Sequence, residues 1–167
     1  MNSTIEVIQN RKSIRSYLER PIPQAEKDAI IDAVLRSPSA GNMMLYSIIE
    51  VNDQNTKDEL VKTCDNQPLI GKAPFVLLFL ADYQRWLDYY QISGVEESCR
   101  ELGRTPRNPG VGDLLLACCD ALIAAQNAVL AAESIGIGSC YIGDILENYE
   151  IHRELFILPR YTLPITL

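Results

Sequence analysis

The stretch LLLACCDALIAAQNAVL, residues 114–130, does most to decide how this chain folds. It is apolar apart from Asp120 and two amide side chains, and acidic residues flank it closely. These polar groups are too costly inside a lipid bilayer, where a span needs about 18 uninterrupted apolar residues. Gly136, shortly after the stretch, suits the end of a helix. The pattern therefore predicts one long helix from Gly112 to Gly136, buried at the centre of a globular protein.

The elements around this helix are predicted from their periodicity. The run PFVLLFLA, residues 74–81, has the length and continuous apolar character of a central strand buried on both faces. Further strands are expected over 46–51, 139–142 and 162–167, and helices from near Thr4 and over 24–35, 56–63, 83–90 and 146–156. The stretch 93–112 is expected to form an excursion or lid. Separated strands among many helices indicate an α+β or mixed α/β fold with one central sheet.

The composition and charge of the chain limit the kinds of ligand and macromolecule that it can bind. The 167 residues are 47% hydrophobic, which fits a single globular domain. The net charge of −7 argues against nucleic acid, because phosphates demand a basic surface. Any anionic ligand must therefore be held by a local basic cluster. Five cysteines without a CxxC pair, and a polar N-terminus without a signal sequence, indicate a cytoplasmic protein with reduced thiols.

One such basic cluster is the segment RKSIR, residues 11–15. It places three cations and a hydroxyl within five residues of an acidic protein. In an extended segment, Arg11, Ser13 and Arg15 would face the same side. Guanidinium groups and a hydroxyl suit a phosphate or the carbonyl edge of a heterocycle. Taken alone, the segment is better explained as a solvated basic patch.

Two further segments are candidates for contact with a flat ligand. Residues 37–42, SPSAGN, offer small side chains and open backbone, although an ordinary loop would look the same. Residues 136–144, GIGSCYIGD, resemble a dinucleotide-binding fingerprint only superficially, because the glycines precede the strand. Gly143 instead suits a backbone amide that is aimed at a ligand atom.

The three segments, in this order and spacing, resemble the nitroreductase family. The segments at 46–51 and 125–128 and the residue Gln67 are similar to its oxygen-insensitive NADPH nitroreductase and flavin reductase branch. The resemblance covers nearly the whole chain. It implies a nitroreductase-like α+β fold, with a central, mostly antiparallel sheet flanked by helices, and a single FMN-binding domain over residues 1–167.

The resemblance also implies an activity. The protein would be a cytoplasmic FMN-dependent oxidoreductase that transfers reducing equivalents from NAD(P)H to nitro-aromatics, quinones or free flavin by a ping-pong mechanism. It would be a homodimer with two FMN sites at the subunit interface. The flavin would be the reactive centre, with no catalytic side chain, metal ion, nucleic acid or membrane involved. The alternatives are a flavin-binding protein of the same fold without turnover and a flavin-dependent dehalogenase.

Eleven positions match the family's flavin contacts. Those implied to hold the FMN phosphate and the pyrimidine edge are Arg11, Lys12, Ser13 and Arg15. Ser39 and Asn42 would reach the flavin from the other subunit, and Gln67 would meet its polar edge. The segment that would cover one flavin face and direct amides at the ring is Tyr141, Ile142, Gly143 and Asp144.

The sequence departs from the family pattern in two places. Met43, Met44 and Leu45 stand where the family usually has a glutamine soon after the small-residue loop. The sequence also stops at Leu167, within the expected last strand, whereas the family continues into an arm that embraces the partner and adds a cation to the phosphate site. We therefore expect a fold truncated at the C-terminus, in a shortened member of the family or a fragment of one.

Overall fold

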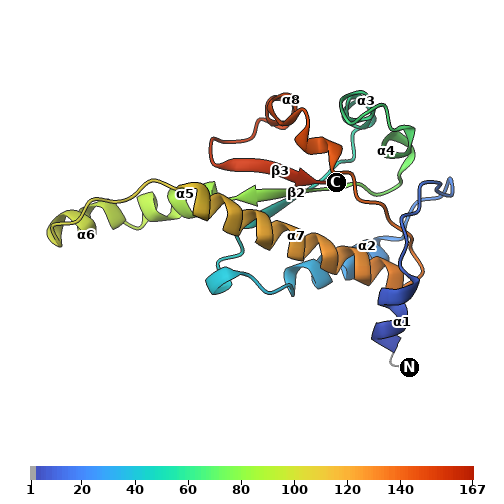
Figure 1. The fold of residues 1–167 in the computed structure, drawn as a ribbon, viewed down its shortest axis with the longest axis horizontal. Coiled ribbons are helices and arrows are strands. Elements are labelled where there is room, and N and C mark those ends of the chain that lie inside the picture. Colours follow the sequence, from blue (N-terminus) through green and yellow to red (C-terminus); the bar gives the residue numbers. More distant parts are fainter. Residues whose placement is uncertain (1–2) are drawn as a thin grey trace.

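An antiparallel sheet of three strands lies at the centre of the computed structural model, which describes residues 3–167 (Figure 1). The strands are β1 (Tyr46–Glu50), β2 (Leu77–Asp82) and β3 (Thr162–Thr166), in the order β1-β2-β3. Every residue of the middle strand β2 is buried, as its continuous apolar run predicts. The antiparallel sheet expected from the sequence is therefore confirmed.

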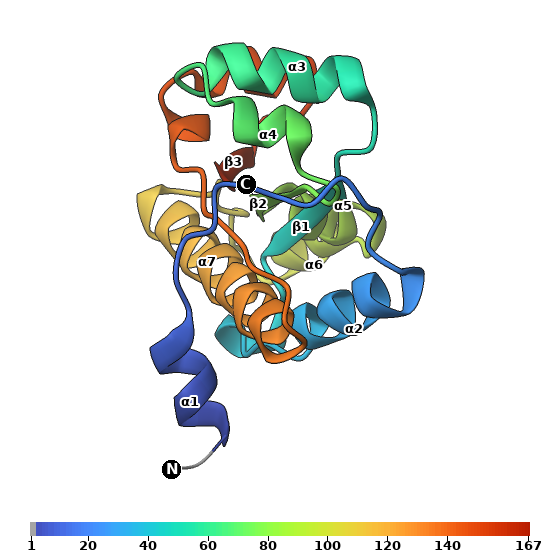
Figure 2. The ribbon, with the colours of Figure 1, turned by 90° about the vertical axis from the view of Figure 1, so that its right-hand side faces the viewer.

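Helices cover both faces of this sheet (Figure 2). They are α1 (Ser3–Asn10), α2 (Gln24–Leu35), α3 (Gln54–Thr63), α4 (Pro68–Lys72), α5 (Gln84–Ile92), α6 (Val95–Glu101), α7 (Val111–Ser134) and α8 (Tyr149–Leu155), with short 3-10 turns η1 (Ala40–Asn42) and η2 (Asp144–Leu146). Because side chains alternate along a strand, Phe79 of β2 faces a core made with α2 and α7. Leu78 and Leu80 face a second core, made with α3, α4 and the segment around η2.

The long helix α7 forms from the predicted stretch, but only one of its faces is buried. Alanines such as Ala117, Ala121 and Ala124 pack against α2 and the sheet, where their small side chains allow a close approach. The opposite face is apolar and exposed: Leu115 is 60% exposed and Leu122 is 49% exposed. The prediction of a fully buried helix is therefore wrong for this face.

α7 is the one helix among residues 3–167 that is long and apolar enough to cross a membrane. Length and composition alone are weak grounds for a span, since core helices of soluble proteins meet the same test. Here Asp120, near its middle, is 2% exposed and accepts hydrogen bonds from the protein's own backbone. The helix is thus built into the protein core along that face.

Three local expectations need correction. Residues 139–142 do not form a strand: they make one bridge, between Ser139 and Ser13, and one backbone pair, between Ile142 and Leu167. The stretch 93–112 projects from the body of the molecule with α5, as the expected excursion does, but it contains a helix, α6, that was not predicted (Figure 1). The short helix α4, which begins at Pro68, was not predicted, because five residues carry too little periodicity.

Candidate functional site

The basic segment 11–15 runs extended after α1 and lies beside residues 138–139. Ser13 forms a parallel bridge with Ser139, and the amide of Ile14 donates to the Ser139 carbonyl at 2.9 Å. The approach is close because Gly138 lacks a side chain: a Cβ at Gly138 would lie 2.5 Å from Cγ1 of Ile14. The first and third sequence motifs are therefore in direct contact.

The cations of this segment have no acidic partners. Among the described residues, Arg11, Lys12 and Arg15 form neither a salt bridge nor a side-chain hydrogen bond, although Asp and Glu outnumber Lys and Arg in the chain by 22 to 15. Lys12 and Arg15 are exposed and Arg11 is half-buried. A cluster of uncompensated positive charge in an acidic protein attracts anions, and guanidinium groups bind phosphate with good geometry.

Tyr141 connects this charge to the third motif. Its hydroxyl is 3.2 Å from Oε1 of Gln126 on α7, and burial raises the pKa of the Tyr141 phenol to about 12. The positive charge of Arg11 acts in the opposite direction on this pKa, which places Arg11 close to the phenol. Tyr141 therefore remains a neutral phenol at physiological pH, with 37% of its surface open to a ligand.

Ile142 and Gly143 play different parts from each other. The side chain of Ile142 is 3% exposed and packs in the second core, and its backbone N–H and C=O both pair with Leu167. The Ile142 side chain and both of its backbone hydrogen-bonding groups are therefore engaged within the protein. Gly143 is exposed, and within residues 3–167 its N–H has no acceptor. It is the better candidate for an amide that binds a ligand.

Gln67 and Asp144 are brought together by the fold. Nε2 of Gln67 donates to Oδ2 of Asp144 at 2.6 Å. The two residues that precede Gln67, Asp65 and Asn66, have φ values of 55° and 52°, a conformation that non-glycine residues adopt rarely. This tight turn and a hydrogen bond from the Gln67 amide to the Val61 carbonyl fix Gln67 at the start of α4.

Ser39 and Asn42 lie elsewhere. The amide of Ala40 in this loop donates to Oδ1 of Asp120, near the middle of α7, whereas Ser139 follows the C-terminal end of that helix. On the same helix, Tyr141 contacts Gln126, which lies six residues and roughly 9 Å beyond Asp120 at 1.5 Å per residue. Figure 1 shows the cyan 40–42 turn below the N-terminal half of α7, and the orange segment leaves the other end of that helix. Among residues 3–167, no hydrogen bond joins Ser39 or Asn42 to any of the other nine.

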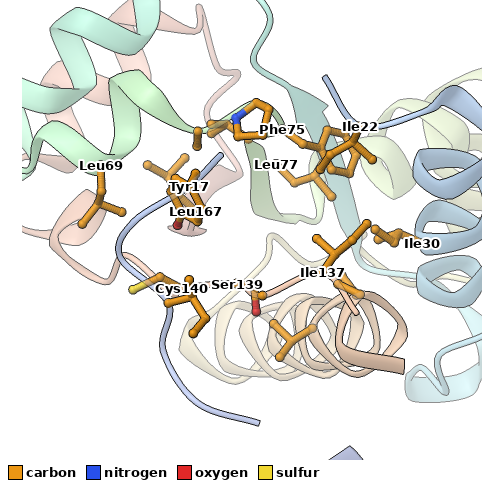
Figure 3. A pocket seen from close by; sticks show the side chains of 18 of the residues that line it. Tyr17, Ile22, Ile30, Leu69, Phe75, Leu77, Ile137, Ser139, Cys140 and Leu167 are labelled. Carbon is orange, nitrogen blue, oxygen red and sulfur yellow. The ribbon is translucent and has the colours of Figure 1, made fainter. Parts of the chain in front are cut away.

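A cavity of about 440 Å³ opens beside the site (Figure 3). It lies between residues 14–23, strand β2 and the C-terminal half of α7, and its lining includes Ser139, Tyr141 and Ile142 of the third motif. Most of the lining is apolar, with side chains such as Phe75, Leu77 and Ile137. None of the cations of residues 11–15 lines it. The cavity therefore suits an apolar group and not a phosphate.

Two residues that position the site were not singled out from the sequence. Asp120 was noted only as a polar interruption of an apolar helix, yet it binds both ends of the 39–45 loop. Gly138 was one glycine among several in its motif, and its role depends on the neighbouring Ile14. A buried acid in an apolar run is a usable signal, because an unpaired charge there would be costly. The contact between Gly138 and Ile14 leaves no such signal.

No group of three or more potential metal ligands occurs in the part of the chain that the structure describes. The arrangement is instead that of an anion site with a polar edge and an adjoining aromatic ring.

Comparison with known proteins gives the same family that the motifs resemble. The model of the nitroreductase family matches residues 8–165. The chain is 34% identical over 166 residues to an FMN reductase [NAD(P)H] of Bacillus subtilis, covering 99% of this chain and 64% of that protein. It is 33% identical over 165 residues to an oxygen-insensitive NADPH nitroreductase of Salmonella typhimurium, covering 99% and 63%.

Solved structures of similar proteins have the same fold as this chain. NfrA2 of B. megaterium superposes with a TM-score of 0.89 at 31% identity, covering 99% of this chain and 64% of that one. The NADPH:FMN oxidoreductase of Vibrio harveyi, complexed with NAD+, superposes with a TM-score of 0.86 at 31% identity, covering 99% and 66%. The chain thus spans just under two thirds of the length of these relatives.

Proposed function

Because the chain belongs to the nitroreductase family, we propose that it binds FMN and uses it to pass reducing equivalents from NAD(P)H to a small electron acceptor. The names of its relatives, an FMN reductase and an NADPH nitroreductase, support this proposal. The observation that carries it in this chain is the set of three cations without acidic partners, in a segment that contacts residues 138–139 through Ser13 and Ile14. Nitro-aromatics, quinones and free flavin are the proposed acceptors.

The donors and acceptors present fit FMN. Arg11, Lys12 and Arg15, with the hydroxyl of Ser13, supply the charge and hydrogen bonds that a phosphate needs. Gln67 donates its amide hydrogen to Asp144, which leaves its carbonyl oxygen free to accept from an imide N–H. The Gly143 N–H is free to donate to a ring nitrogen or carbonyl.

When bound, FMN supplies the redox chemistry, and the protein binds, orients and tunes it. A cation at the pyrimidine edge stabilises the negative charge that develops there on reduction, an effect of order a few kcal/mol in a preorganised site. Arg15 and Lys12 are the candidates for this cation. The donor and the acceptor would use one face of the ring in turn, which gives ping-pong kinetics.

We also propose that the active form is a homodimer. The exposed apolar face of α7, with the neighbouring exposed residues Ile5 and Ile8 of α1, is the surface that a second copy would cover. Within residues 3–167, no hydrogen bond joins Ser39 or Asn42 to the other proposed site residues. A second copy would supply them.

The test is to purify the protein and identify its ligand. We expect heat to release FMN, identified by mass spectrometry, and NADPH or NADH to bleach the bound flavin under nitrogen. FAD, or no flavin even after soaking with FMN, would contradict the proposal. Bound FMN that neither nucleotide reduces would indicate a flavin-binding protein without turnover.

A further inference from the structure

The loop from Ser39 to Leu45 is held in an unusual conformation. Gly41, Asn42 and Met44 have φ values of 55°, 57° and 50°. Asn42 tolerates this region, but the Met44 side chain disfavours it, so the surrounding structure must hold Met44 there. Strained backbone of this kind is often found at binding sites, where it presents a residue in a fixed orientation.

Asp120 enforces this conformation from α7. Its Oδ1 accepts from the amide of Ala40 at 3.0 Å, and its Oδ2 accepts from the amide of Leu45 at 3.1 Å. The side chain is 2% exposed, and no cation in the described residues pairs with it. A buried carboxylate is costly unless hydrogen bonds compensate it. Here both compensating bonds come from the two ends of one loop.

Other side chains complete the arrangement. Nε1 of Trp86 donates to the Met43 carbonyl at 2.8 Å, and Nη1 of Arg85 donates to the Met44 carbonyl at 3.3 Å. The Met44 amide donates to Oγ of Ser39 at 3.0 Å. The loop's polar groups are thus directed inward, while Asn42 stays exposed at its tip.

We propose that Asp120 is a positioning residue: it shapes the 39–45 loop so that Ser39 and Asn42 complete the flavin site of the partner subunit. This inference rests on the proposed function. It adds that a buried acid of one protomer controls FMN binding at a site whose cations belong to the other. Asp120→Asn removes one acceptor and places an amide N–H against a backbone N–H, so we expect FMN to bind about tenfold more weakly, or worse.

The decisive experiment uses mixed dimers. One subunit carries Arg15→Ala and the other carries Asp120→Asn, each with a different affinity tag, and FMN binding is titrated by the quenching of its fluorescence. If Asp120 acts on the partner's site, one site of the mixed dimer has both defects and the other has none. We expect one tight FMN site per mixed dimer, and no tight site in either variant homodimer. General destabilisation by Asp120→Asn would weaken both sites and restore neither.

Two further variants make the outcome decisive. Asp113→Asn, a charge-matched change on the same helix, lies away from the loop and should leave FMN affinity unchanged. If Asp120→Asn does not fold, Asn42→Ala keeps the Asp120 contacts and should show the same complementation with Arg15→Ala. A mixed dimer without a tight site, or an Asp120→Asn homodimer with wild-type affinity, overturns the positioning role. Wild-type protein that binds no FMN overturns the proposed function itself.

Discussion

Arg15 shows how much of this site depends on single residues. It is an exposed cation beside a half-buried tyrosine, Tyr17, and no acidic residue of the described chain pairs with it. Isolated in this way, a guanidinium is available to bind a phosphate. Its unpaired state is a property of the fold, since the sequence shows only that acids are absent nearby.

We expect Arg15→Ala to weaken FMN binding by about 1–3 kcal/mol, the usual effect of losing a charge-assisted hydrogen bond. Titration of the apoprotein with FMN measures this. Arg100→Ala is the matched control, because Arg100 is an exposed cation on α6 whose only ion pairs are the loose ones to Glu96 and Glu97, at 3.9 and 3.8 Å. Equal affinities for the two variants would remove Arg15 from the site.

Gly138 is a second residue whose identity the site requires. We expect Gly138→Ala to displace Ile14, because its Cβ would lie 2.5 Å from Cγ1 and 3.0 Å from Cβ of that branched side chain. Such overpacking costs about 1–3 kcal/mol and would move the 11–15 segment. Urea unfolding and FMN titration should both register the loss. In Gly112→Ala, at the start of α7, the new Cβ has no neighbour within 4 Å, so stability should be kept or slightly raised.

At the scale of elements, α8 is joined to the site by His152. Its side chain is fully buried, with Nδ1 2.7 Å from the Ile145 carbonyl and Nε2 2.8 Å from Oγ1 of Thr63. The first bond joins α8 to η2, which contains Asp144, and the second joins it to the end of α3, just before Gln67. The histidine thus connects the two segments that carry Asp144 and Gln67.

Burial lowers the pKa of His152 from its ordinary value of 6.5, so the folded protein holds the neutral ring. The unfolded chain therefore binds the proton more readily. The neutral His152 ring therefore stabilises the folded state fully above pH 6.5, and this stabilisation is lost as the pH falls below 6.5. Over that range its contribution to the free energy of unfolding changes by up to about 1.4 kcal/mol per pH unit. We expect His152→Gln to be less stable than wild type at pH 7 and to lose less stability between pH 7 and 5.

Urea unfolding at several pH values measures the free energy of unfolding of both proteins. Because both contain the same carboxylates, subtracting one curve from the other removes the contribution of those groups. Parallel stability curves for wild type and His152→Gln would show that the buried ring does not control this pH dependence.

Elements with long, strong patterns could be predicted, and short or context-dependent ones could not. The helix at Gln24–Leu35 has the predicted bounds, and β1, β2 and α7 begin within a few residues of expectation. The strand expected at 139–142 was wrong because a short apolar run looks the same in a strand and in an irregular segment with one bridge. The proposed site residues come from motif matching. Their arrangement in space depends on tertiary packing.

At the scale of the whole molecule, α7 has two roles. One face builds the core with alanines, and the other presents leucines to solvent at an energetic cost that a second copy would relieve. Leu115 and Leu122 are seven residues apart and so lie on the same side of the helix. The loop that Asp120 holds borders this helix. We therefore expect a second copy to bind along the exposed face of α7.

This leads to a prediction about assembly. Leu122→Glu places a charge on the exposed apolar face in both copies, and burying two unpaired carboxylates in an interface is strongly unfavourable. We expect light scattering to find the 18.7 kDa monomer, where the wild type gives twice that mass, and FMN affinity to fall because Ser39 and Asn42 no longer reach the site. Ile157→Glu is the control, since Ile157 is 89% exposed and lies outside α7, so mass and FMN binding should not change. A Leu122→Glu monomer that binds FMN as tightly as wild type would show that one protomer forms the complete site.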